Sequence, residues 1–97
     1  MTIKTKADAQ KFYEAVLTLQ TVEECEAFFE DICTYQEMEA IAQRMEVALL
    51  LWEDMRYNDV NKQTGASTAT ICRVSKALNY GAGGYKTAIE RLKENEN

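Results

Sequence analysis

The chain has 97 residues, enough for one domain and too few for two. It is 46% hydrophobic and 28% charged, with four Gly and no Pro, which excludes a disordered tail, a collagen-like repeat and a Pro-rich linker. Three cysteines without a Cys-x-x-Cys pair argue against a disulfide framework or a zinc site, and the absence of histidine removes the usual general base. We therefore expect no enzyme, no cofactor and no metal site.

No targeting or membrane-spanning segment is expected. The N-terminal residues MTIKTKADAQ lack the apolar stretch of a signal peptide. The longest apolar run, residues 47–52, has six residues, far short of the roughly 20 that a membrane span needs. The sequence thus predicts a soluble, cytoplasmic protein with reduced thiols.

Charge is distributed unevenly along the chain, whose net charge is −5. Residues 1–54 hold four Lys/Arg and twelve Asp/Glu, a net of −8. Residues 55–93 hold seven Lys/Arg and two Asp/Glu, a net of +5, and the last four residues contribute −2. A basic pole of this kind can face phosphates, although a helical protein whose charges segregated by chance has the same pattern.

The first half of the chain predicts three helices. Residues 7–19 carry apolar residues at helical spacing, and two capping boxes follow. In each box a threonine hydroxyl accepts from the third helical amide, and a glutamate reaches back to the amide of the threonine. The boxes, Thr21 with Glu24 and Thr34 with Glu37, open a second helix and a long third helix that runs to about residue 55. The predicted apolar positions are Phe12, Val16 and Leu19 on the first helix, and Val22, Cys25, Phe28, Phe29 and Ile32 on the second.

The long helix is apolar nearly all round, so it must be covered nearly all round. A chain with six short helices has little material for that, so we expect a homodimer with this helix at its centre. The alternative is a central core helix in a monomer. One stripe holds Met38, Ile41, Met45, Ala48, Trp52 and Met55, and Val47, Leu50 and Leu51 lie outside it.

Residues 58–79 have the pattern of a helix-turn-helix. A short helix over 58–64 ends at Gly65, Ser67 is a good N-cap, and a second helix covers 68–79. Residues 81–84 form a glycine-rich break before a last helix over 85–93. The predicted inward residues are Val60, Ala66, Ile71, Val74 and Leu78 in the motif, and Ala88, Ile89 and Leu92 in the last helix.

The polar start of the second motif helix predicts contact with the DNA major groove. Hydroxyls there can bond base edges or phosphate oxygens, and small apolar groups can pack on a thymine methyl. Asn61 departs from the small residue usual where such helices cross. A purely structural helix pair is the alternative. The predicted base-reading residues are Ser67, Thr68, Ala69 and Thr70, and the residues predicted near the DNA backbone are Asn58, Asn61, Lys62, Arg73 and Lys76.

These motifs resemble a known family. Residues 59–78 are similar to helix-turn-helix repressors in general, including the Lac repressor class. The stretch 34–78 resembles the Trp repressor, and the whole chain resembles the Trp-repressor-like YerC/YecD group of bacterial proteins. The residues that carry the likeness are TYQEMEA at 34–40, Arg44, GAS at 65–67 and ATICR at 69–73.

The resemblance implies an all-α, six-helix helix-turn-helix fold in an intertwined homodimer. Its partner is double-stranded DNA with a palindromic operator, and residues 1–56 would be dimerisation helices, 57–79 the reading head and 80–97 the break and last helix of a single domain. Two arginines that sandwich the family's effector fall on Arg44 and Arg73, and a threonine beside its carboxylate falls on Thr34. Backbone carbonyls that receive its amino group fall near Asp31 and Cys33.

Two residues depart from the family's effector site. The glycine that makes room for an indole ring corresponds to Val74, and a nearby serine corresponds to Ala77. An added isopropyl group either clashes with a fitted ligand or fills its space. We therefore expect an effector that is smaller than tryptophan or differently shaped, or no effector, with surface or phosphate contacts as the alternative role of both arginines.

The predicted function is a sequence-specific transcriptional regulator, most simply a repressor. The alternative is a helical, dimeric protein–protein interaction module without DNA binding. That alternative accounts directly for the net charge of −5, but it gives no role to the polar residues at 67–70.

Overall fold

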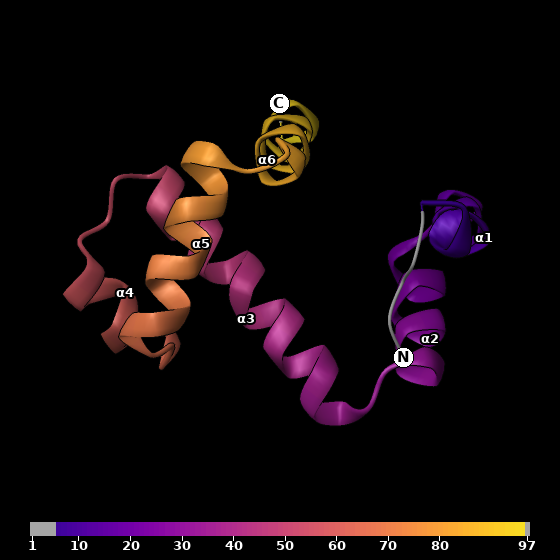
Figure 1. The fold of residues 1–97 in the computed structure, drawn as a ribbon, viewed down its shortest axis with the longest axis horizontal. Helices are drawn as coiled ribbons and strands as arrows, with labels where there is room; N and C mark the ends of the chain where they lie inside the picture. Colours follow the sequence, from indigo (N-terminus) through magenta and orange to yellow (C-terminus); the bar gives the residue numbers. More distant parts are fainter. Residues whose placement is uncertain (1–5, 97) are drawn as a thin grey trace. The chain divides into compact units, whose positions relative to one another are not determined.

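The structure, a computed structural model, describes residues 6–96, with side chains from residue 9. Within that range it contains helices and no strand (Figure 1). The all-α prediction and its six helices are confirmed. Residues 1–5 and 97, which belong to the predicted single domain, lie outside the described range. The helices are α1 (Lys6–Leu17), α2 (Val22–Ile32), α3 (Tyr35–Trp52), α4 (Tyr57–Thr64), α5 (Thr68–Tyr80) and α6 (Gly84–Asn95).

The chain divides into two compact units, Met1–Met38 and Glu39–Asn97, so the boundary falls within α3. In the first unit, α1 meets α2 through aromatic rings. Phe12 stacks on Phe28 at 6.1 Å between ring centroids and meets Phe29 edge-on at 6.4 Å. These contacts join the two helices by aromatic packing.

The first unit nevertheless buries little. Ala9 is the one buried residue among its described side chains, and α2 has none. The predicted apolar face of α2 is therefore divided: Phe28 and Phe29 are half-buried, whereas Val22 and Ile32 are exposed by 77% and 53%. The unit alone leaves much of its apolar surface open to water.

The capping box predicted at the start of α3 forms with both of its hydrogen bonds. At the start of α3, Glu37 N donates to Thr34 Oγ1 at 3.1 Å and Thr34 N donates to Glu37 Oε1 at 2.8 Å. The pKa of the Glu37 carboxyl is held below its ordinary value, mainly by the hydrogen bond from the Thr34 backbone N–H and to a smaller extent by the Thr34 hydroxyl.

The box at the start of α2 differs from the prediction in one bond. Glu24 N donates to Thr21 Oγ1 at 3.0 Å, as expected, but the carboxylate of Glu24 accepts from Gln20 N at 2.9 Å. The extended backbone at Thr21 (φ −133°, ψ 162°) brings the preceding amide within reach of the carboxylate.

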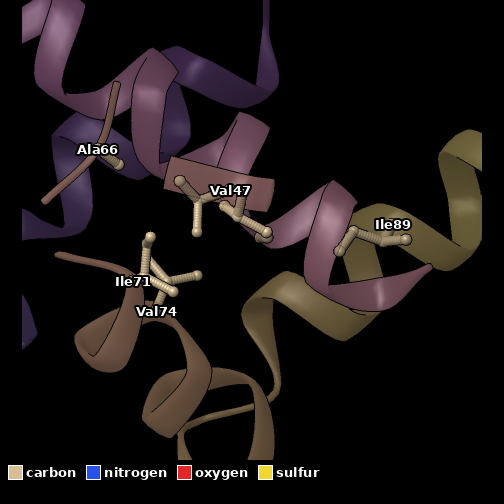
Figure 2. Close-up of a cluster of buried hydrophobic side chains, with 7 residues drawn as sticks. Val47, Ala66, Ile71, Val74 and Ile89 are labelled. Atoms are coloured by element: carbon tan, nitrogen blue, oxygen red, sulfur yellow. The ribbon is translucent and has the colours of Figure 1, made fainter. Parts of the chain in front are cut away.

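The second unit has a continuous apolar core. Val47 of α3, together with Ile71 and Val74 of α5, points into a shared space in Figure 2. The inward positions predicted for the helix-turn-helix are confirmed, with Leu78 half-buried against the cluster. The core residues, each exposed by 2% or less, are Val47, Ala48, Val60, Ala66, Ile71, Val74 and Ile89.

Helix α3 is covered unevenly. It ends at Trp52, earlier than predicted, and its C-terminal half packs within the core of the second unit, where Val47 and Ala48 are fully buried. Nearer its start, Tyr35 is 82% exposed and Ile41 is 43% exposed. The chain therefore covers the half of α3 that follows residue 46 with its own α4, α5 and α6.

The prediction for the last helix was partly wrong. Ile89 is fully buried, but Ala88 is exposed and Leu92 is 46% exposed. The reason is that α6 meets the core along a row four residues apart, in which Tyr85 packs on the core and Lys93 pairs with Glu53 at the end of α3. The hydrogen bond to Glu53 raises the pKa of the Lys93 ammonium above its ordinary value.

Replacing Ile71 by Ala is expected to lower the free energy of unfolding by about 2–5 kcal/mol, because it removes a fully buried side chain from the core that joins α5 to α3. Urea unfolding followed by circular dichroism at fixed protein concentration measures it. Tyr80→Ala, at a residue 85% exposed on the same helix, serves as control and should change stability by less than about 0.5 kcal/mol. An equal loss in both variants would contradict the assignment of the core.

Candidate nucleic-acid interface

Helices α4 and α5 are joined by a turn of three residues, Gly65, Ala66 and Ser67. Gly65 adopts a left-handed conformation (φ 76°), and its N–H bonds to Asn61 O at 2.8 Å. A side chain would be strained in that conformation. Ala66 is 1% exposed and anchors the turn in the core. Gly65 reverses the chain direction, and the buried side chain of Ala66 attaches the turn to the core. The direction in which α5 leaves the turn is therefore defined.

Side chains of α4 satisfy the polar groups of this turn. Asn61 Nδ2 donates to Ala66 O at 2.7 Å, and Ala66 N donates to Thr64 Oγ1 at 3.0 Å. Gln43 Nε2 of α3 donates to Thr64 O at 3.3 Å. Sequence reasoning missed this network, although the departure at Asn61 was a signal for it. A longer polar side chain at that position spans the turn.

The start of α5 exposes hydroxyls to solvent, with Ser67 as the predicted N-cap. Ser67 Oγ accepts from Thr70 N at 3.1 Å and donates to Thr70 Oγ1 at 3.1 Å. Thr68 and Ala69 are exposed, and Thr70 is half-buried. The hydroxyl proton of Thr70 therefore remains free to donate, whereas that of Ser67 is engaged within the turn.

The basic side chains of α4 and α5 have no carboxylate partners among the residues that the structure describes. Between residues 9 and 96 the ion pairs are Lys11–Glu14, at 3.6 Å, and Lys93–Glu53. The cations of α4 and α5 are exposed and take part in neither pair, so their charge faces solvent. The exposed residues predicted near the DNA backbone are Asn58, Asn61, Lys62, Arg73 and Lys76, and Arg56 lies just before α4.

The predicted effector residues are divided between the two units. Thr34 lies in the first unit, where its hydroxyl caps α3, and Arg44 and Arg73 lie in the second. Arg44 is half-buried and Arg73 is exposed. Val74, at 2% exposure, is packed into the core of the second unit. Its isopropyl group thus occupies core space where a glycine would leave room.

Other candidate chemistry is sparse in the described part of the chain. Cys25 and Cys33 are half-buried free thiols, and Cys72 is an exposed one. Residues 6–96 contain no cluster of three or more Cys, Asp and Glu side chains that could hold a metal ion. None of their helices has the length and apolar character to cross a bilayer.

The chain thus has two helices, a three-residue turn between them and a polar start to the second helix, and this arrangement is that of helix-turn-helix proteins. The family model for the Trp repressor protein matches residues 7–93, and the chain belongs to that family, which consists of non-enzymatic regulators. The expectation that the chain is not an enzyme is therefore confirmed.

Three relatives show how much of the chain the likeness covers. The uncharacterized protein YerC of Bacillus subtilis (strain 168) is 45% identical over 89 residues, 92% of this chain and 86% of YerC. The crystal structure of a TrpR-like protein from Eubacterium eligens ATCC 27750 has a TM-score of 0.85 at 47% identity, covering 93% of this chain and 92% of that one. A Staphylococcus aureus crystal structure assigned provisionally as a Trp repressor has a TM-score of 0.87 at 33% identity, covering 95% of this chain and 96% of that one. The Trp-repressor-like fold is thereby confirmed.

Replacing Asn61 by Ala is expected to lower the free energy of unfolding by about 1–3 kcal/mol, because it leaves the part-buried carbonyl of Ala66 without its donor. Chemical denaturation measures the change. Gln63→Ala alters an exposed amide on the same helix and should be nearly neutral. If the two variants unfold at the same denaturant concentration, the Asn61 bond does not stabilise the turn.

Proposed function

We propose that the protein is a sequence-specific, DNA-binding transcriptional regulator whose reading head is α4, the turn and α5. The observation that carries this proposal is the start of α5, where a left-handed glycine and a buried alanine aim an exposed, hydroxyl-bearing helix end outward. The first turn of the second helix is the part that such motifs insert into the major groove. Membership in a family of regulators supports the same conclusion.

Different residues of the head suit different contacts. Thr68, Ala69 and the free proton of Thr70 suit base edges and thymine methyl groups. Ser67 acts mainly by capping α5, and its remaining lone pair can accept from a base amino group. Asn61 holds the turn through one Nδ2 hydrogen, and its second Nδ2 hydrogen can donate to a phosphate oxygen. Asn58, Lys62, Arg73 and Lys76 are exposed and suit phosphate contacts.

The overall acidity of the chain is compatible with this role because the two units differ in charge. Residues 1–38 contain three Lys/Arg and eight Asp/Glu, a net of −5, whereas residues 39–97 contain eight of each. Within the second unit, residues 56–80 hold four Lys/Arg and one Asp/Glu, a net of +3. DNA bound at residues 56–80 would interact mainly with this local positive charge, and the negative net charge of the whole chain would matter less.

The chain is expected to retard random duplex DNA at low salt, with an affinity that falls steeply as salt rises, because bound phosphates release counterions. Lys76→Ala should weaken binding to all sequences and lower the slope of log K against log salt by about 1. Lys86→Ala, at an exposed lysine on α6, is the matched control. Absence of retardation at low salt, or a flat salt dependence, would argue against groove binding.

We also propose that the functional form is a homodimer. In the first unit a groove of about 790 Å³ is lined by α2 and the start of α3, with Val22, Phe29 and Met38 among its residues. The exposed apolar side chains of α2 and the open N-terminal half of α3 need a cover, and a second copy can bury the same surfaces reciprocally. Two heads related by a twofold axis would read a palindrome with half-sites ~34 Å apart.

Val22→Glu is expected to convert the dimer to a monomer, because it places a charge in the groove at a site that is 77% exposed in the single chain. Sedimentation equilibrium should give twice the 11.1 kDa chain mass for the unmodified protein and one chain mass for the variant. Ala27→Glu adds the same charge at an exposed position outside the groove and should leave the dimer intact. A monomeric unmodified protein would contradict the proposal.

We propose that any amino-acid-like effector engages Arg44 and Arg73, because a guanidinium forks onto a carboxylate, with Thr34 as the third predicted effector residue. Tryptophan itself fits poorly, since the isopropyl group of Val74 stands where the family has a glycine. Calorimetric titration with tryptophan should therefore show no binding at micromolar concentration. A micromolar heat signal would prove this reading of Val74 wrong.

The second candidate function is a protein–protein interaction module. Its supporting observation is the acidic first unit with exposed Leu17, Val22 and Tyr35. The DNA retardation experiment separates the two functions, because a module of this kind leaves duplex DNA unbound at every salt concentration.

A further inference from the structure

The second unit contains a cavity of about 400 Å³ beside the reading head. It lies between the end of α3, the α3–α4 connection, the start of α4 and the C-terminal half of α5. Its size falls in the range of small-molecule sites. None of the predicted DNA or effector residues lines it. The lining residues are Leu51, Trp52, Asp54, Met55, Tyr57, Ser75, Leu78 and Asn79.

The polar groups of this cavity are ordered by hydrogen bonds that leave acceptors free. Tyr57 Oη donates to Ser75 Oγ at 2.6 Å, and Asn79 Nδ2 donates to Ser75 O at 2.9 Å. The amide nitrogen of Asn79 is thus engaged, and its carbonyl oxygen remains as an acceptor. Asp54 forms no ion pair with any residue between 9 and 96. No Lys or Arg lines the cavity, so its net formal charge is −1.

The backbone at Asp54, whose carboxylate is among the groups that line the cavity, has an uncommon conformation. Asp54 is the one residue other than glycine with positive φ (62°) in residues 6–96, and its N–H bonds to Leu51 O at 3.0 Å. Asp and Asn tolerate this conformation better than most residues. Beside it, Trp52, Met55 and Leu78 provide a half-buried apolar wall.

We infer that this cavity binds a small organic ammonium compound with an apolar body. The ammonium group supplies only donors, matching the acceptors of Asp54 and Asn79, and an aromatic ring such as that of Trp52 attracts a cation bound beside it. The remaining apolar residues would receive a hydrocarbon or aromatic body. An anionic ligand would meet a carboxylate with no cation in the lining to offset it. The site would operate whether or not the protein binds DNA.

Trp52 gives a direct measurement of binding, because it is the single tryptophan of the chain. The unmodified protein is titrated with phenethylammonium, with 3-phenylpropionate as the anion of the same ring and linker, and with 2-phenylethanol as the neutral analogue. Phenethylammonium is expected to change Trp52 fluorescence saturably and to bind at least about ten-fold more tightly than the anion. No saturable change, or equal affinity for the cation and the anion, would overturn the inference.

Asp54→Asn keeps a residue that tolerates positive φ and removes the charge. It should weaken phenethylammonium about ten-fold or more, as expected for the loss of one charge-assisted hydrogen bond. Asp59→Asn removes an exposed carboxylate of α4 outside the cavity and should leave the affinity unchanged. Equal weakening in both variants would mean that the affinity depends only on the net charge of the protein, and it would contradict the proposed binding site.

Asn79→Leu provides a second test in case Asp54→Asn alters the fold. It removes the free carbonyl acceptor and should weaken phenethylammonium while leaving 2-phenylethanol binding unchanged or tighter. Circular dichroism establishes that each variant is folded. Undiminished phenethylammonium affinity in folded Asn79→Leu and Asp54→Asn would overturn the inference.

Discussion

The structure of the second unit depends on the turn between α4 and α5. Gly65 reverses the chain in a left-handed conformation that a larger side chain resists, and Ala66 then enters the core with Val60 and Ile71. These two residues determine the direction of α5 relative to α4. Val74 of α5 then packs in the same core cluster as Val47 of α3. The position of the exposed hydroxyls and of the proposed reading face follows from that packing.

The two units differ in how completely they bury their apolar side chains. The second unit encloses its own core, because α4, α5 and α6 contribute apolar residues to one cluster around α3. The first unit joins α1 to α2 mainly through Phe12, Phe28 and Phe29 and keeps exposed apolar side chains on α2. This contrast supports the proposed association through the first unit, with the polar surface of the second unit left exposed. The units also differ in net charge, which is −5 for residues 1–38 and zero for residues 39–97.

Family membership establishes the regulator class and the fold, and the residues of this chain set its particular features. Val74 fills core space, which supports the proposal that the effector chemistry of the family does not carry over unchanged. Asn61 spans the turn and takes on a structural task at a position where a small residue is usual. The cavity beside Trp52 lies on a different part of α5 from Arg73 and Val74 and offers chemistry of the opposite charge, with a carboxylate in place of a guanidinium.

Sequence patterns determined the elements of this protein because the signals involved are local. A threonine three residues before a glutamate predicts a cap, Gly65 predicts a helix end, and apolar spacing predicted Val60, Ile71 and Val74 inside. The pattern failed for Ala88 and Leu92, since a period of 3.6 residues does not say how wide a stripe the neighbouring helices will cover.

Tertiary structure alone decided which groups from distant parts of the chain meet. The bond from Gln43 to Thr64, the pairing of Glu53 with Lys93, and the convergence of Asp54 with Asn79 on one cavity join residues more than twenty positions apart. No local periodicity encodes such contacts, because they depend on the angles at which packed helices cross. The sequence by itself determined the helices, their caps and the polarity of the head, and packing determined where those polar groups stand.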